Sequence, residues 1–334
     1  MMALIDITVI WLGIIGLGVF MYVLLDGFDL GIGILYPFAP DEQSRDTLMG
    51  SVAPVWDGNE TWLILGGAGL LAAFPAVYSI YLPALYLGVF LMLAGLIFRG
   101  VAFEFRFKSS RTRWFWNAAF AGGSLLAAAA QGFVVGAYIQ GFEVEGYTYV
   151  GGPLDWLTPF TTFTAFSLVI GYALLGATWG ILKTEGATQR WLYRVTPWLL
   201  LVLVLCLIGI TIWTPLIQER ILARWLESWT VLWPLPVLGA VAVVLLWRGL
   251  RQRWEVAPFM CSMALFVTVY LGLVSSQWPY MVPPDITFRE AASAPEAQLF
   301  LLLGMLFLLP IIIGYTAWTY WIFRGKIQAG AGYH

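Results

Sequence analysis

The chain has 334 residues, of which 60% are hydrophobic and only 11% are charged, and its mean hydropathy is +0.83. This apolar share is too large for a water-soluble globular protein and is typical of a chain that lies mostly in a membrane. The net charge is −2 and no basic patch lies beyond the ends of the loops, so nothing indicates a nucleic-acid partner.

Continuous apolar segments predict nine membrane-spanning helices. Each segment runs for 18 residues or more, whereas the strands of a membrane β-barrel would alternate apolar and polar side chains. The expected fold is an all-α polytopic membrane protein, with residues 1–334 in a single integral membrane domain. The counts fit two four-helix bundles plus one extra helix. The spans are expected at about 8–35, 49–74, 81–99, 115–139, 160–182, 191–213, 230–247, 257–276 and 297–323.

The first span carries two acids close to its carboxyl end. Before it, the first ten residues contain Asp6 but no Lys or Arg, so we expect no cleavable signal peptide and a retained first helix. Asp26 and Asp29 are three residues apart and share one helix face. With Tyr36 as the end of the span, Asp29 lies about 10 Å deep and Asp26 about 15 Å deep.

The second span carries a second pair of ionisable side chains. The stretch Ala53–Trp62 places Asp57 and Glu60 at the start of an apolar run. The rise per helical residue puts these two acids at about the same depths as the first pair. If the two helices pack side by side, the four carboxyls form two tiers, Asp29 with Asp57 and Asp26 with Glu60. Ionisable groups at such depth are expensive and indicate a functional site.

The third span ends at Arg99, on the same side of the membrane. One interpretation is structural: the acids satisfy helix ends or pair with Arg99 to fix the packing, and Arg99 is an anchor at the membrane boundary. The other is that closely placed carboxyls titrate together and carry protons. We favour the proton pathway for Asp57, Asp29 and Asp26, while Glu60 could equally extend toward the membrane surface.

The connections between the spans differ sharply in charge. Those after the odd-numbered spans hold 14 of the 17 Lys and Arg: Arg45; Arg99, Arg106, Lys108, Arg111 and Arg113; Lys183, Arg190 and Arg194; Arg248, Arg251 and Arg253; Arg324 and Lys326. The positive-inside rule therefore predicts a cytoplasmic C-terminus and an N-terminus outside. The connections 140–159, 214–229 and 277–296 are acidic and too short to form a soluble domain.

Several cofactor sites are excluded by the residues present. The only histidine is His334, the last residue, so this chain acting alone cannot bind haem through paired histidines. The sequence contains no GxxxxGK[ST] and no CxxC motif. We therefore expect neither a nucleotide site nor a metal site in this chain.

Several motifs together resemble subunit II of the cytochrome bd quinol oxidases. They are LLDGFDLGIG at Leu24–Gly33, APVWDGNETWLIL at Ala53–Leu65, FRGVAFEFR at Phe98–Arg106, SQWP at Ser276–Pro279 and the closing FRGK of Tyr315–Lys326. The resemblance covers essentially the whole chain. It implies a subunit of a terminal oxidase in the bacterial cytoplasmic (inner) membrane that transfers electrons from quinol to oxygen and takes protons from the cytoplasm.

The resemblance also implies where the cofactors and the proton path lie. The partner, subunit I, would hold haem b and haem d and oxidise quinol, and this chain would be the haem-free subunit. The proton-pathway acids of the family match Asp29 and Asp57, with Asp26 and Arg99 in the matching motifs. Val55 replaces a histidine and Glu60 a glutamine found in several members, which resembles the cyanide-insensitive branch and leaves open haem d or only haem b. A permanently bound quinone and small accessory subunits also stay open.

Two other functions are compatible with acids inside a membrane. A proton- or ion-coupled secondary transporter uses such residues, but it usually shows broken helices around a midplane site, whereas these acids lie toward one side. A purely structural assembly subunit is the second alternative. Acid-to-amide substitutions that abolish turnover and leave the haem spectrum intact would distinguish the proton pathway from it.

Overall fold

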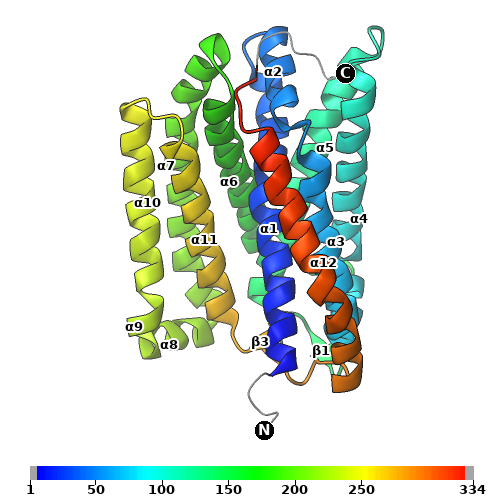
Figure 1. The fold of residues 1–334 in the computed structure, drawn as a ribbon. Coiled ribbons are helices and arrows are strands. Elements are labelled where there is room, and N and C mark those ends of the chain that lie inside the picture. Colours follow the sequence, from blue (N-terminus) through cyan, green and yellow to red (C-terminus); the bar gives the residue numbers. More distant parts are fainter. Residues whose placement is uncertain (1–5, 328–334) are drawn as a thin grey trace.

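The computed structural model describes residues 6–327, and these residues are mostly helical, as predicted. The long helices run side by side along one axis (Figure 1). The helices are α1 (Ile7–Leu35), the 3₁₀ turn Tyr36–Phe38, α2 (Glu42–Val52), α3 (Trp56–Ala73), α4 (Pro75–Arg106), α5 (Arg113–Gln140), α6 (Pro159–Lys183), α7 (Gly186–Ile217), α8 (Glu219–Glu227), α9 (Trp229–Leu232), α10 (Pro234–Arg251), α11 (Ala257–Gln277) and α12 (Pro295–Ile322).

Two small antiparallel hairpins complete the fold, and the sequence analysis did not predict them. They pair β1 (Val144–Glu145) with β2 (Thr148–Tyr149) and β3 (Tyr280–Val282) with β4 (Ile286–Thr287). Figure 1 shows both hairpins with α8 and α9 at one end of the molecule and α2 at the other. We call these the hairpin end and the α2 end. The connections rich in Lys and Arg lie together at the α2 end.

Eight of the helical segments in the described chain are long and apolar enough to cross a membrane. These are α1, α4, α5, α6, α7, α9 with α10, α11 and α12. The second predicted span, 49–74, is not one helix: the chain bends at Ala53–Val55 and forms α2 and α3 instead. Pro54 has no N–H to donate, and its ring disfavours a continuing helix. Asp57, Asn59 and Glu60 lower the hydropathy of α3, which is not among the eight.

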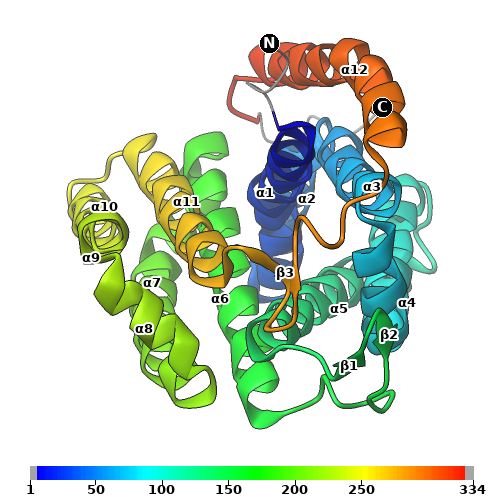
Figure 2. The same cartoon turned by 90° about the horizontal axis from the view of Figure 1, so that it is seen from below.

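The helices pack in two neighbouring groups around α6. Helix α1 contacts α3, α5 and α6, while α6 also contacts α7 and α11. Close approach of α1 and α6 requires glycine, because a Cβ on Gly31 would lie 1.8 Å from the Tyr172 carbonyl oxygen and a Cβ on Gly176 would lie 2.4 Å from the carbonyl carbon of Gly31. Helix α12 packs outside α1 and α3 (Figure 2). Within the apolar part of α12 only 6% of the residues are buried in the protein, against 72% for α6.

Candidate functional site

A fully buried arginine forms the centre of a polar cluster inside the helices. Arg99, on α4, donates from one terminal nitrogen to Asp26 Oδ1 at 2.6 Å and from the other to Glu60 Oε2 at 3.0 Å. Asp26 lies on α1 and is fully buried, whereas the Glu60 side chain on α3 is 26% exposed. The guanidinium also lies over the ring of Trp56, 5.9 Å from its centroid. One cation therefore links three helices.

A second buried carboxyl, Asp29, lies one turn along α1 and has a different partner. Asn59 Nδ2 donates to Asp29 Oδ2 at 2.7 Å and to the Leu25 carbonyl at 3.3 Å. The Tyr320 hydroxyl of α12 donates to Asn59 Oδ1 at 2.8 Å. Because both its donor and its acceptor are engaged, the Asn59 amide is fixed in one orientation. It holds one oxygen of Asp29 in place.

The cluster contains more carboxyl groups than cations. Arg99 is the cation bonded to Asp26 and Glu60, and Asp29 is the third acid beside them. Among residues 6–327, Asp26 Oδ2 and Asp29 Oδ1 are buried oxygens without a hydrogen-bond partner. Buried carboxylate oxygens are costly unless bonded, and a proton bound to one of the acids reduces the uncompensated charge. The arrangement is therefore suited to binding and releasing a proton.

Polar side chains continue from Asp26 in the direction of the hairpin end. Gln131, on α5, donates to the Tyr22 hydroxyl at 2.9 Å and accepts from the Tyr172 hydroxyl at 2.7 Å. Tyr22 precedes Asp26 by four residues on α1 and so lies on the same helix face. Since Tyr22 accepts from Gln131, its own hydroxyl proton stays available to the carboxyl.

A cavity of about 200 Å³ lies beside the cluster at the α2 end. Its walls include Val55, Trp179, Lys183, Tyr320 and Phe323, from the bend before α3, from α6 and from the end of α12. Tyr320 therefore borders the cavity and also binds Asn59. This places one hydroxyl and one amide between the cavity and Asp29.

The chain after α12 is held against the cavity by a set of contacts that we call the tail anchor: Lys183, Gln189, Glu255, Lys326 and Ile327. Lys326 Nζ lies 2.9 Å from Glu255 Oε1, which also accepts from Gln189 Nε2 at 3.0 Å. The Ile327 amide donates to the Lys183 carbonyl at 2.9 Å. The hydrogen bonds from Lys326 and Gln189 lower the pKa of Glu255.

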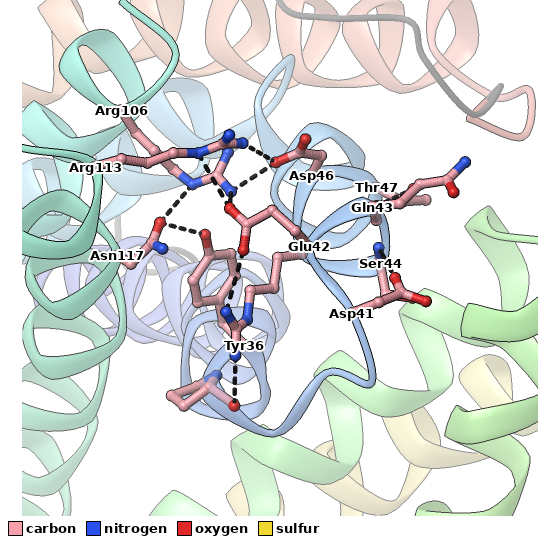
Figure 3. A network of polar contacts seen from close by, with 12 residues as sticks. Tyr36, Asp41, Glu42, Gln43, Ser44, Asp46, Thr47, Arg106, Arg113 and Asn117 are labelled. Carbon is pink, nitrogen blue, oxygen red and sulfur yellow. Dashed lines mark hydrogen bonds and ion pairs between the residues drawn. The ribbon is translucent and has the colours of Figure 1, made fainter. Parts of the chain in front are cut away.

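A second ionic network ties α2 to α4 and α5 (Figure 3). The fully buried Arg106 lies 2.8 Å from Glu42 Oε1 and 2.6 Å from Asp46 Oδ1, and its Nε donates to Asn117 Oδ1 at 2.7 Å. Arg113 binds the same Asp46 oxygen at 2.8 Å. The side chains of the two acids in this network, Glu42 and Asp46, are about two-fifths exposed. We interpret this network as a clamp that holds the short polar helix in place.

The structure brings together four of the five predicted site residues. Asp26, Glu60 and Arg99 are in direct contact, so the pairing of Asp26 with Glu60 takes place through the arginine. Arg99 is fully buried inside the chain and paired with two acids. Asp57 is exposed on α3, and the residue that reaches Asp29 is Asn59 instead. The expected tier of Asp29 with Asp57 is wrong because α3 turns Asn59, not Asp57, toward α1.

Several uncharged residues of the site were missed by the sequence analysis. Gln131 gave a signal, as a lone amide within an apolar segment. Asn59 lies within the motif at Ala53–Leu65 and Tyr320 within that at Tyr315–Lys326, but neither was predicted as a site residue. Tyr320 meets Asn59 across 261 positions of sequence, so no local pattern could pair them.

Comparisons with known proteins find relatives that match almost the whole chain. The family model described as cytochrome bd terminal oxidase subunit II matches residues 7–323. The cytochrome bd-I ubiquinol oxidase subunit 2 of Escherichia coli strain K12 is 29% identical, with 95% of this chain and 94% of that protein covered. The cytochrome bd ubiquinol oxidase subunit 2 of Bacillus subtilis strain 168 is 25% identical, with 98% of each covered.

A solved structure has the same fold. A chain of the bd oxidase from Geobacillus thermodenitrificans superimposes with a TM-score of 0.74 at 18% identity. The match covers 95% of this chain and 99% of that one. Every long helix therefore has a place in a known architecture.

Proposed function

Because this chain belongs to the cytochrome bd terminal oxidase subunit II family, we propose that it works beside a subunit I in a bacterial quinol oxidase and supplies its proton-uptake path. The similarity to relatives named as ubiquinol oxidase subunits supports quinol as the electron donor. The similarity to such a subunit extends over 95% of the chain, and it therefore does not favour the alternative function as a secondary transporter. Lipid surrounds this multi-pass subunit.

The residues of the cluster do not fit a haem site in this chain. It offers carboxyls, a guanidinium, an amide and phenols, none of which is the paired imidazole of a low-spin haem. The single histidine, His334, lies outside the described residues. We therefore assign haem b, and haem d or a further haem b, to subunit I.

The proposed proton path begins at the cavity of the α2 end. Reduction of oxygen to water consumes protons, and charge does not cross hydrocarbon without protonatable groups and water. A proton that reaches the cavity moves past Tyr320 over water molecules to Asp29 and then to Asp26, because the amide between Tyr320 and Asp29 cannot itself relay a proton. The Asn59 amide orients Asp29, and Arg99 holds Asp26 and Glu60 in place. The observation that carries this proposal is the row of buried polar groups, from the cavity wall to Asp29, that the structure contains.

Asp57 has a separate part in the proposal. It lies in the first turn of α3, where the helix dipole favours a negative charge, and its side chain is exposed on the surface of the chain. A carboxylate on a membrane helix must face protein or water rather than lipid. We assign this surface of α3 to the contact with subunit I, where Asp57 transfers protons between the subunits.

Orientation and span number complete the proposal. Helix α3 is the ninth crossing, stabilised by the polar cluster although its hydropathy is low. Helices α1, α3, α4 and α5 form one four-helix group, α6, α7, α10 and α11 form the other, and α12 is the extra helix of a single membrane domain. The α2 end, with its basic connections, faces the cytoplasm.

The test is an acid-to-amide substitution in the assembled oxidase. Asp29→Asn keeps the shape and the contact with Asn59 but cannot bind and release a proton. We expect a complex that still contains its haems but whose rate of quinol oxidation falls at least about tenfold, since general acid–base groups contribute roughly 10²–10⁴-fold to a rate. The same loss is expected for Asp57→Asn. Glu104→Gln is the control, because Glu104 is exposed and binds only Lys108 in the described chain.

The outcome separates three roles. Loss of turnover with an intact haem spectrum supports proton conduction. Near-normal turnover in Asp29→Asn would make that acid structural, and loss of the haems would show that it serves assembly.

A further inference from the structure

A second cavity, of about 210 Å³, lies between α7 and α10 at the α2 end and is separate from the carboxyl cluster. It is lined by Tyr193, Pro197, Trp247, Leu250, Arg251 and Arg253. Because Arg251 is the last residue of α10, one of the long apolar helices, the cavity lies where hydrocarbon meets water. It combines two cations with two aromatic rings.

Each arginine of this cavity lies over an aromatic ring. The guanidinium of Arg251 is 4.7 Å from the centroid of Trp247, and that of Arg253 is 4.7 Å from the centroid of Tyr193. Tyr193 is itself fixed, since its hydroxyl donates to the Trp254 carbonyl at 2.9 Å. Stacking occupies the face of a guanidinium and leaves its N–H edge for a planar or tetrahedral oxyanion. Within residues 6–327 neither arginine forms an ion pair with an acid.

The backbone directs Arg253 toward its ring. Arg253 has φ +58°, the left-handed conformation that glycine adopts without strain, and it ends α10 together with the bond from the Trp254 amide to the Gly249 carbonyl at 2.9 Å. In this position the Arg253 side chain lies over Tyr193 while the residue stays exposed.

The surroundings of the cavity are strongly positive. Arg190, Arg194 and Arg248 lie at the same end of α7 and α10, and none of them pairs with an acid in the described part of the chain. The nearby acids Glu185 and Glu255 both bind Lys326 of the tail anchor. The cavity thus attracts an anion, and the neighbouring carboxylates are already engaged.

Apolar side chains continue from the cavity along both helices. On α7, Leu201 and Leu205 follow Pro197 at intervals of four residues and are 48% and 59% exposed. On α10, Val244 and Val241 precede Trp247 at intervals of three and are exposed. These spacings place each set on one helix face. A ligand bound by the arginines would therefore meet an apolar surface on the membrane side.

We propose that this cavity is a binding site for the phosphate headgroup of an anionic phospholipid, with its acyl chains along the exposed faces of α7 and α10. Arg251 and Arg253 bind the phosphate oxygens with their free N–H edges, as guanidinium groups do. Basic pockets between membrane helices at the membrane surface bind acidic headgroups in this way. A free phosphate ion would use the arginines alone, whereas a phospholipid also uses the apolar faces below them.

The test measures lipid binding to the purified, delipidated oxidase complex by native mass spectrometry. The probes are phosphatidylglycerol, phosphatidylcholine and inorganic phosphate, each added separately. The wild type is expected to bind one phosphatidylglycerol that the double variant Arg251→Gln, Arg253→Gln binds about thirtyfold more weakly, given the contribution of each basic residue near a membrane surface. The control is Arg324→Gln, since Arg324 also lies over a ring, that of Trp321, but lines neither cavity.

Each outcome decides the proposal. A loss of phosphatidylglycerol in the double variant, with Arg324→Gln unchanged, supports it, and so does weaker binding of phosphatidylcholine. Equal binding of phosphatidylglycerol by the wild type and the double variant would overturn it. Arginine-dependent binding of inorganic phosphate without any phospholipid would replace the lipid site by a plain anion site. Equal elution profiles and haem spectra of all variants confirm that they are folded.

Discussion

Arg99 pairs with two carboxylates, Asp26 and Glu60, so the loss of folding free energy on its removal can be predicted. Arg99→Gln leaves Asp26 fully buried without its cation. Breaking a buried ion pair by removal of one partner costs about 3–5 kcal/mol of folding free energy. Glu60 adds less, because its partly exposed carboxyl is screened by solvent. Thermal unfolding of the purified complex measures this loss.

The matched control for Arg99 is Lys108→Gln. Lys108 pairs with Glu104 at 3.0 Å, but their side chains are 74% and 53% exposed. Such surface pairs contribute about 0–1 kcal/mol, so the unfolding temperature is expected to stay nearly unchanged. Equal shifts in the two variants would contradict the central place of Arg99.

The sequence predicts the charged members of the site better than the neutral ones. Asp26, Glu60 and Arg99 are identifiable because ionisable groups deep in an apolar segment are rare and expensive. Asn59 and Tyr320 are not, since an amide or a phenol in a membrane helix is tolerated in many roles. Which residue of α3 reaches Asp29 depends on the rotation of that helix, and the bend at Pro54 sets this rotation.

At the scale of elements, the contact between α1 and α6 depends on the absence of a side chain at Gly31. A Cβ there would lie 1.8 Å from the Tyr172 carbonyl oxygen, which belongs to the backbone and cannot rotate away. Gly31→Ala therefore forces the two helices apart, and overpacking of this kind costs typically about 1–3 kcal/mol. A lower unfolding temperature and a smaller yield of assembled complex are the expected readouts.

Another glycine provides the comparison for this substitution. A Cβ on Gly67 would meet nothing within 4 Å. Gly67→Ala is expected to leave stability unchanged or to raise it by up to about 1 kcal/mol, because alanine favours the helix. If both variants behave alike, close approach of α1 and α6 is not what Gly31 provides.

The tail anchor has a stability that depends on pH. Hydrogen bonds from Lys326 and Gln189 lower the pKa of Glu255, so its contribution is present above the ordinary glutamate value of about 4.3 and is lost as pH falls through the lowered pKa. For Lys326, desolvation lowers the pKa, but the hydrogen bonds and negative charges of Glu255 and Glu185 together outweigh it, and the net change is upward. That contribution is present below about 10.4 and is lost as pH rises through the raised pKa.

We therefore expect constant protection of the Ile327 amide between about pH 5 and 9, and loss of protection below about pH 4. Hydrogen exchange, corrected for the intrinsic rate at each pH, measures it through the bond from that amide to the Lys183 carbonyl. Glu255→Gln should be less protected at neutral pH and insensitive to acid. Equal acid sensitivity in this variant would assign the effect to another group.

At the scale of the whole molecule, the charge partition predicts the orientation of the bundle. The basic connections lie together at the α2 end and the acidic ones at the hairpin end. A reporter that is active only outside the cytoplasm is expected to be inactive when fused after His334 and active when fused within the connection 140–159. The opposite pattern would invert the proposed orientation and move the cavity beside Tyr320 to the outer side.

Hydropathy placed every long apolar helix, and it gave the bounds of two almost to the residue, since 8–35 and 257–276 correspond to Ile7–Leu35 and Ala257–Gln277, whereas 81–99 is shorter than Pro75–Arg106 at both ends. The division of 49–74 was not, because its apolar carboxyl part concealed the separate polar helix α2. The hairpins were missed because strands of two or three residues carry too little pattern. Hydropathy identifies segments that are stable in hydrocarbon. Helix α2 and the hairpins depend on tertiary contacts instead, so hydropathy does not identify them.

The ion pair between Asp26 and Arg99 also constrains how the protein is made. Its partners are 73 residues apart, so a ribosome that adds about 5–20 residues per second completes the arginine on the order of 4–15 s after the aspartate. During that interval α1 has no cation for a carboxyl that lies deep in its apolar length. The first helix therefore either enters lipid with Asp26 protonated or waits beside the translocation channel until α4 arrives. In the second case, insertion of α1, α3 and α4 is one coupled event during synthesis.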